Sequence, residues 1–264
     1  MIERKVKSIR ALERGLDVLA EVQRSGGISL HELHVRLGLA KATLLRLLVT
    51  LASRGHIWQR LADGAYLPTS VDAPKRRPDV SDRLAEIASP LLVELSERVV
   101  WPSILAVPRM DHLEIIETNS RLARFDAAVL GPVGVKLSYI HTATGRAYLA
   151  ACGAQERAAI IARLQPADAS AAELELLETI IAETRTRGYS TREPHHPWAD
   201  RNRQTVLRDG KSSIGVAISV GGHAVAALNV TWPSRRVSVE DVVARHLATV
   251  QSVAERIGHA LDAM

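Results

Sequence analysis

The most informative segment of the chain is residues 28–48, ISLHELHVRLGLAKATLLRLL. Apolar residues recur at helical spacing on both sides of Gly38, which predicts two short amphipathic helices, over residues 29–37 and about 41–54. A glycine suits the turn between them because it adopts the left-handed conformation that ends a helix without steric cost. Two helices joined in this way are typical of a helix-turn-helix motif, whose second helix enters the major groove of DNA.

The residues around this motif complete a small domain. Leucines at helical spacing predict a first helix over about residues 8–24. Ser29, followed three residues later by Glu32, predicts a capping box at the start of the second helix. After the third helix, two short apolar runs flank Asp63-Gly64, a dipeptide suited to a tight hairpin turn. A hairpin directly after a recognition helix is a wing, so the order of elements indicates a winged helix-turn-helix.

Positive charge is concentrated in the same region. Residues 1–78 hold 14 Lys and Arg against 7 Asp and Glu, a net charge of +7, whereas residues 79–264 hold 20 against 22, a net charge of −2. A basic segment of this kind favours duplex DNA as its partner, because its cations neutralise phosphates. The candidate DNA contacts are Ser29, Lys41, Ala42, Thr43, Arg46, Thr50 and Arg60.

The rest of the chain is expected to form a second domain. The polar, proline-interrupted stretch from Ser70 to Ser81 indicates a hinge. We therefore place a DNA-binding domain in residues 1–69, a linker with a helix in residues 70–98 and an effector domain in residues 99–264. Apolar patterns in the last of these predict strands over 101–107, 112–117, 213–220 and 224–231 and helices over 145–151, 155–163, 171–187 and 239–261. Strands mixed with helices indicate an α+β domain with a largely antiparallel sheet.

Several classes of protein are disfavoured by what the chain lacks. Its single cysteine, Cys152, cannot form an internal disulfide and is expected to be a small buried side chain. No apolar run is long enough to span a membrane, and the N-terminus has no apolar secretory core, so we expect a cytoplasmic protein without a membrane partner. A nucleophile elbow, a phosphate loop and a paired metal motif are all missing, so we predict no catalytic residues, no cofactor and no enzyme activity.

Six stretches resemble the isocitrate-lyase-regulator (IclR) family of transcription factors. In the N-terminal region they are residues 10–19 (RALERGLDVL), 38–48 (GLAKATLLRLL) and 51–57 (LASRGHI). In the second domain they are residues 141–150 (HTATGRAYLA), 187–189 (RGY) and 213–218 (SIGVAI). The similarity follows the family's order over nearly the whole chain. The short motif at residues 99–103 (VVWPS) resembles the branch of the family that activates hydroxyphenylpropionate catabolism.

This resemblance implies an architecture and a set of partners. It implies a winged helix-turn-helix head, a linker helix and a GAF-like effector domain, in homodimers or dimers of dimers that bind a palindromic operator in double-stranded DNA. A member that activates transcription would also contact RNA polymerase. The chain departs from the family pattern at Ala40, Ala42 and Leu45, where proline, serine and histidine are frequent. Because Ala42 lacks a hydroxyl that could contact DNA, the operator sequence does not carry over.

The resemblance also implies an effector pocket at the start of the helix that follows Thr142. Backbone amides at a helix N-terminus suit a carboxylate, so the expected effector is a small organic acid. The matching residues are Thr142, Ala143, Thr144, Gly145, Arg146, Ser213, Asn229 and Thr231, with Asp200 as a looser match in a longer loop. Some effector domains of the family hold zinc, for which His195, His196 and Asp200 would be the candidates, but we predict no metal here.

Three tryptophans of the second domain, Trp101, Trp198 and Trp232, stand next to prolines in a chain that is poor in aromatic residues. Such side chains can either wall an aromatic ligand or pack at strand ends, and the sequence leaves both interpretations open. Trp101 is kept as a candidate ligand contact.

The sequence thus predicts a ligand-responsive transcriptional regulator of a catabolic operon, with a small organic carboxylate as effector; the tryptophans leave open whether that acid is aromatic. One alternative is a metabolite-binding or enzymatic module whose DNA-binding head only localises it, and the missing catalytic motifs disfavour it. The other is an architectural DNA-binding protein without a ligand, against which a polar, lined pocket would count.

Overall fold

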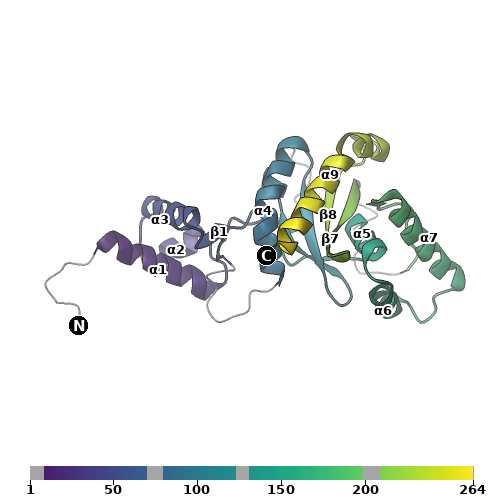
Figure 1. Cartoon of the computed structure of the whole chain (residues 1–264), viewed down its shortest axis with the longest axis horizontal. Coiled ribbons are helices and arrows are strands. Elements are labelled where there is room, and N and C mark those ends of the chain that lie inside the picture. Colours follow the sequence, from purple (N-terminus) through teal and green to yellow (C-terminus); the bar gives the residue numbers. More distant parts are fainter. Residues whose placement is uncertain (1–8, 70–79, 123–130, 199–208, 264) are drawn as a thin grey trace. The chain divides into compact units, whose positions relative to one another are not determined.

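The computed structural model describes residues 9–69, 80–122, 131–198 and 209–263 (Figure 1). The chain divides into two compact units, residues 1–86 and 87–264. We call the first unit the head and the second the effector unit, and each is described by itself. Within the described ranges, no helix combines the length and the apolar character that crossing a membrane requires.

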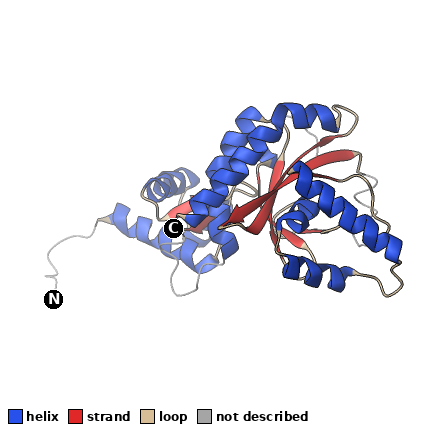
Figure 2. Ribbon diagram, turned by 45° about the vertical axis from the view of Figure 1, so that its right-hand side comes forward, coloured by secondary structure: helices blue, strands red, loops and turns tan. Residues whose placement is uncertain are grey.

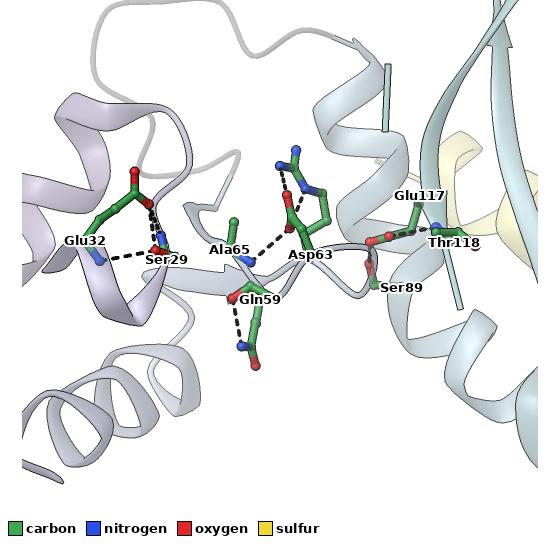
Figure 3. A network of polar contacts seen from close by, with 10 residues as sticks. Ser29, Glu32, Gln59, Asp63, Ala65, Ser89, Glu117 and Thr118 are labelled. Atoms are coloured by element: carbon green, nitrogen blue, oxygen red, sulfur yellow. Dashed lines mark hydrogen bonds and ion pairs between the residues drawn. The ribbon is translucent and has the colours of Figure 1, made fainter. Parts of the chain in front are cut away.

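The head begins with three helices close to the predicted positions. These are α1 (Arg10–Ser25), α2 (Leu30–Leu37) and α3 (Lys41–Ser53). The capping box at α2 is confirmed, because the Ser29 hydroxyl accepts a hydrogen bond from the Glu32 amide while the Glu32 carboxylate accepts one from the Ser29 amide (Figure 3). Helix α2 ends at Gly38 in the left-handed conformation, with φ of 64°, as the sequence predicts.

The wing is present, but its turn is longer than the sequence suggests. Strands β1 (Ile57–Gln59) and β2 (Tyr66–Pro68) pair antiparallel, and Ile28 adds a bridge to Tyr66. Residues 60–65 connect them, so the expectation of a tight two-residue turn at Asp63-Gly64 is wrong. The Asp63 carboxylate closes this longer loop by accepting hydrogen bonds from the Ala65 amide and the Arg60 guanidinium (Figure 3).

The head has its own core, and a helix follows it. Its buried residues come from all three helices and both strands: Val18, Val22, Ile28, Leu33, Leu44, Leu48, Ile57 and Tyr66. Helix α4 (Val80–Arg98) follows, so the predicted hinge is wrong at its last two residues, because Val80 and Ser81 are helical. The rest of the predicted hinge, residues 70–79, lies outside the described residues.

The effector unit is built on a six-stranded antiparallel sheet in the order β5-β4-β3-β8-β7-β6. The four longer strands match the predictions: β3 (Ser103–Pro108), β4 (Leu113–Thr118), β7 (Lys211–Val220) and β8 (His223–Pro233). The two edge strands, β5 (Lys136–Leu137) and β6 (Ser190–Thr191), are missed by the sequence. Two residues are too few to show the alternation that reveals a strand.

Helices cover both faces of this sheet (Figure 2). They are α5 (Ala143–Ala151), α6 (Ala154–Leu164), α7 (Ala171–Arg187) and α9 (Val239–Asp262), beside α4. Gly215 of β7 lies against the Ala143 carbonyl of α5, whereas Ile218 lies against Gly258 of α9. Successive side chains of a strand point to opposite faces, so α5 and α9 lie on opposite sides of β7. The predicted α+β fold, with a winged helix-turn-helix before an antiparallel effector sheet, is therefore confirmed.

Candidate functional site

Helix α3 of the head presents an exposed face beside a buried one. Leu44 and Leu48 are buried in the head's core. On the opposite side Ala42 and Arg46 are exposed, as the helical periodicity predicts. Lys41 is also exposed, in the first turn of the helix and on the side of Leu48. These side chains come from one helix whose packing does not involve them. They are therefore available to a partner.

Most of the other predicted DNA contacts already form hydrogen bonds within the head. Thr43 is half-buried. The Thr50 hydroxyl donates its proton to the Arg46 carbonyl, and the Ser29 hydroxyl is used in the cap of α2. The Arg60 guanidinium pairs with both oxygens of Asp63, at 2.5 and 3.1 Å. A phosphate contact from Arg60 would have to compete with this ion pair. Burial alone would raise the pKa of Asp63, but hydrogen bonds from Arg60 and the Ala65 amide hold that pKa below its usual value.

Two residues on the exposed face of α3 were missed by the sequence analysis. Leu45 and Val49 are 42% and 66% exposed, although both are large and apolar. Their helical positions could have revealed this exposure. At about 100° per residue, both residues fall on the side of Ala42 and not on the side of Leu44 and Leu48. Neither residue is given a position on the helix in the sequence analysis.

In the effector unit, the start of α5 is capped by its own sequence. Thr142 is the N-cap: its hydroxyl accepts a hydrogen bond from the Gly145 amide (3.0 Å) and donates one to the Ser138 carbonyl (2.6 Å). One of the amides expected to face a carboxylate is therefore taken. Thr144 is fully buried, and its hydroxyl has no hydrogen-bond partner among the described residues. A buried hydroxyl in this state is a candidate for a ligand contact.

Gly145 and Arg146 have packing roles that the sequence did not reveal. A Cβ on Gly145 would lie 2.3 Å from the Ser138 carbonyl oxygen, so glycine is needed for the close approach of this loop. The buried Arg146 guanidinium donates to the carbonyls of Ile140 (2.7 Å), Thr191 (3.2 Å) and Pro194 (2.6 Å). Desolvation lowers the pKa of Arg146 to about 10, so it remains charged at neutral pH. Its side chain joins α5 to β6 and the segment that follows it.

Ser213, Asn229 and Thr231 form one buried polar network, which we call the β7–β8 triad. Ser213 lies opposite Thr231 in the strand pairing, and Asn229 lies opposite Gly215, so the triad occupies the face of the sheet that α5 covers. The two hydroxyls are 2.8 Å apart, and the Asn229 amide nitrogen donates to the Thr231 hydroxyl at 3.3 Å. The Asn229 side-chain oxygen accepts from the Ile104 amide (3.1 Å), which fixes the orientation of the side-chain amide.

The hydrogen bonds of the triad leave one proton unused. Ser213 and Thr231 together carry two hydroxyl protons, and the bond between them uses one. The Asn229 amide donates into the pair and accepts nothing from it. Within the described residues, the triad therefore has a surplus donor in a buried position. Such a site suits an acceptor such as a carboxylate oxygen.

Apolar residues lie beside the triad. Ile104 pairs with Asn229 across β3 and β8, so it shares the same face, and it packs with Ile115, Val135 and Leu137. Polar groups next to an apolar wall are typical of a small-molecule site.

The three tryptophans of the effector unit are buried in different places. Trp101 is buried just before β3. Trp232 is directly opposite Ser212 and therefore lies on the α9 face, away from the triad, where its indole nitrogen donates to the Val237 carbonyl (2.9 Å). For Trp232 the packing interpretation holds. Trp198 is a core residue whose carbonyl accepts a hydrogen bond from His141 (2.9 Å).

The candidate zinc ligands do not come together in the described residues. The His196 ring is hydrogen-bonded to the Glu173 carbonyl (2.9 Å) and the Trp198 amide (3.3 Å), whereas His195 pairs with Glu193. Asp200 lies outside the described residues. The part of the chain that the structure describes contains no group of three His, Cys, Asp or Glu suited to a metal ion. Burial raises the pKa of the Cys152 thiol to about 11, so this thiol is protonated at neutral pH.

Comparison with known proteins accounts for both units. The model of the IclR helix-turn-helix domain matches residues 11–60, and that of the bacterial transcriptional regulator IclR C-terminal domain matches residues 80–259. The chain is 27% identical over 259 residues to the HTH-type transcriptional regulator BhcR of Paracoccus denitrificans, covering 94% of this chain and 86% of BhcR.

Solved structures share the fold. IclR of Thermotoga maritima is similar with a TM-score of 0.56 at 18% identity, covering 97% of this chain and 100% of that one. An IclR homolog of Microbacterium hydrocarbonoxydans, complexed with 4-hydroxybenzoate, is similar with a TM-score of 0.55 at 21% identity, covering 96% and 100%. Together with the two domain models, which span most of the sequence, these likenesses give the identification: the chain belongs to the IclR family of transcriptional regulators.

Proposed function

We propose that this transcriptional regulator senses a small organic carboxylate at the β7–β8 triad and controls a catabolic operon in response. The observation that carries the proposal is the surplus hydroxyl proton of Ser213 and Thr231, which lies buried beside an apolar wall. A hydrogen bond from a neutral donor to a charged acceptor is stronger than one between neutral groups. The site therefore favours the acid over its neutral analogues.

An aromatic acid fits this site better than a purely polar one. Ile104 and Ile115 offer apolar contact next to Asn229, and the Microbacterium homolog holds 4-hydroxybenzoate. The remaining predicted contacts are Thr142, Ala143, Thr144 and Trp101. Of these, Thr144 has the best support because its buried hydroxyl lacks a partner among the described residues. Gly145 and Arg146 are better explained as the packing that holds α5 in place.

The decisive experiment is isothermal calorimetry on the full chain with 4-hydroxybenzoate and other aromatic and aliphatic acids, each beside its neutral amide. We expect an acid to bind and its amide to bind at least ten-fold more weakly. The Ser213→Ala/Thr231→Val double variant, which removes both hydroxyl protons, should weaken binding of the acid about ten-fold, which corresponds to one hydrogen bond to a charged group. Ser219→Ala, at an exposed position further along β7, is the matched control. Equal binding of acids and amides, or full affinity in the Ser213→Ala/Thr231→Val double variant, would place the effector elsewhere.

We also propose that the regulator binds a palindromic operator as a homodimer or dimer of dimers. The N-cap residue Ile9 and Leu12 and Leu16 of helix α1 are exposed and follow the three- and four-residue spacing of a coiled-coil seam. Pairing of this seam with a second copy would remove it from water and would set two recognition helices in symmetric positions. In sedimentation velocity, Leu12→Glu/Leu16→Glu should weaken self-association, whereas Val35→Glu, at an exposed site on α2, should not. An unchanged association state in the seam variant would exclude α1 from the interface.

A further inference from the structure

The exposed face of α3 contains two large apolar side chains. Leu45 and Val49 stand one turn apart, 42% and 66% exposed. At about 100° per residue, Val49 and Ala42 lie at the centre of the face, with Leu45 on one side and Arg46 on the other. The middle of the face is thus apolar, and its charge lies at the edge.

Charge indicates what covers this face. The segment that contains α3, residues 1–78, has a net charge of +7. Lys41 and Arg46 are exposed on the same helix, and exposed cations next to the face fit a polyanion better than another apolar protein surface. In the major groove, the apolar group at the base edges is the 5-methyl group of thymine.

We propose that Leu45 and Val49 are specificity-determining residues that pack on thymine 5-methyl groups in the operator. The proposal rests on the proposed DNA contact through α3 and adds the chemistry of the bases that this helix recognises. Each half-site should contain thymine at the positions that face Val49 and Leu45, and Arg46 should contact a neighbouring guanine or phosphate. Removing a methyl group from such a contact exposes apolar surface worth about one buried CH₂, which predicts about a four-fold loss of affinity for each position.

The test removes the methyl group and nothing else. The full chain is first used to select an operator from random duplex DNA, and each thymine of that operator is then replaced by deoxyuridine, which keeps every hydrogen-bonding group. By gel-shift titration, we expect about four-fold weaker binding at one or two positions of each half-site. The other replacements should have little effect.

Matched protein variants assign the methyl groups to side chains. Val49→Ala should abolish the deoxyuridine penalty at one position and keep it at the other, and Leu45→Ala should show the converse. Both side chains are exposed, so thermal melting should show both variants folded. Val35→Ala, which truncates an exposed apolar residue of α2, should keep both penalties.

The outcomes separate this inference from the proposal on which it rests. A selected operator in which no deoxyuridine costs more than two-fold, or a Val49→Ala/Leu45→Ala protein that retains the full penalties, overturns the thymine contact while leaving sequence-specific DNA binding intact. Failure to select any sequence, or full affinity in Arg46→Ala, overturns DNA contact through α3 and the inference with it.

Discussion

Helices α3 and α5 each contain a stretch that resembles the family, yet the two helices differ in burial. Helix α3 buries Leu44 and Leu48 among its 13 residues. Helix α5 buries eight of its nine residues. A substitution on the exposed side of α3 therefore changes what the protein binds, whereas a substitution in α5 first changes how the effector unit is packed.

This difference decides how family motifs can be interpreted. The motif in α3 places Leu45 and Arg46 where a partner can reach them, and the exposed Val49 directly follows the motif. The motif in α5 contains Gly145 and Arg146, which are required by the loop at Ser138–Ile140 and by the segment after β6. A residue shared by a family of ligand-binding domains can thus serve the architecture around the ligand without touching it.

The largest expected effect comes from Gly145→Ala, which tests the packing role of α5. The new Cβ would lie within 2.5 Å of three backbone atoms of Ser138 and Tyr139, which cannot move away as a flexible side chain could. Overpacking of this kind should lower the free energy of unfolding of the effector unit by about 3 kcal/mol or more. Urea unfolding followed by circular dichroism measures it.

Gly153→Ala is the control for that experiment. A Cβ at Gly153, the N-cap of α6, meets no atom within 4 Å, so we expect a loss of less than about 1 kcal/mol. Equal stability of the two variants would show that the approach between α5 and the Ser138–Tyr139 loop is not tight, and it would return Gly145 to the list of ligand contacts.

An intermediate effect is expected from Arg46→Ala, which removes a side chain from the exposed face of α3. Affinity for the selected operator should fall by about 1–3 kcal/mol if the guanidinium contacts a base edge. The free energy of unfolding should change by less than about 0.5 kcal/mol, because the side chain is exposed. Gel-shift titration and urea unfolding of the same preparation measure both quantities. Arg245→Ala, an exposed site on α9, controls for the loss of one positive charge.

The same comparison explains what the sequence could predict. Long periodic segments such as α3 and α9 were located to within about two residues, because burial of one face requires apolar residues at helical spacing. Helix α1 was located equally well, although Leu12 and Leu16 of its apolar series are exposed and not buried in the head. The capping box at Ser29 was predictable because both partners are local. The resemblance brought Ser213, Asn229 and Thr231 together, and their pairing across β7 and β8 confirms that they are neighbours.

Long-range contacts account for what the sequence could not show. The carbonyls that hold Arg146 come from Ile140, Thr191 and Pro194, up to 48 residues away. No local pattern distinguishes that role from a ligand contact. The exposure of Leu45 and Val49 was overlooked for a different reason: neither residue was given a position on the helix.

The smallest expected effect concerns the starts of the two helices. Helix α5 is capped by the Thr142 side chain, whereas α3 begins after Ala40, which has no side-chain cap. Thr142→Ala should lower the stability of the effector unit by about 1 kcal/mol, because the Gly145 amide loses its acceptor. Ala40→Ser should stabilise the head by about 0.5–1 kcal/mol, because a serine hydroxyl can accept from an amide of the first turn of α3.

The sequence offers a way to follow the two units separately. Trp58 is the single tryptophan of residues 1–86, so a Trp58→Phe background reports on the effector unit, and the difference in fluorescence between the unmodified chain and that background reports on the head. The two substitutions should shift different transitions in urea and in opposite directions. If Ala40→Ser stabilised nothing while Thr142→Ala still cost about 1 kcal/mol, the amides of α3 would already be satisfied in the folded head. The difference between an exposed, uncapped recognition helix and a buried, capped one would then not extend to their first turns.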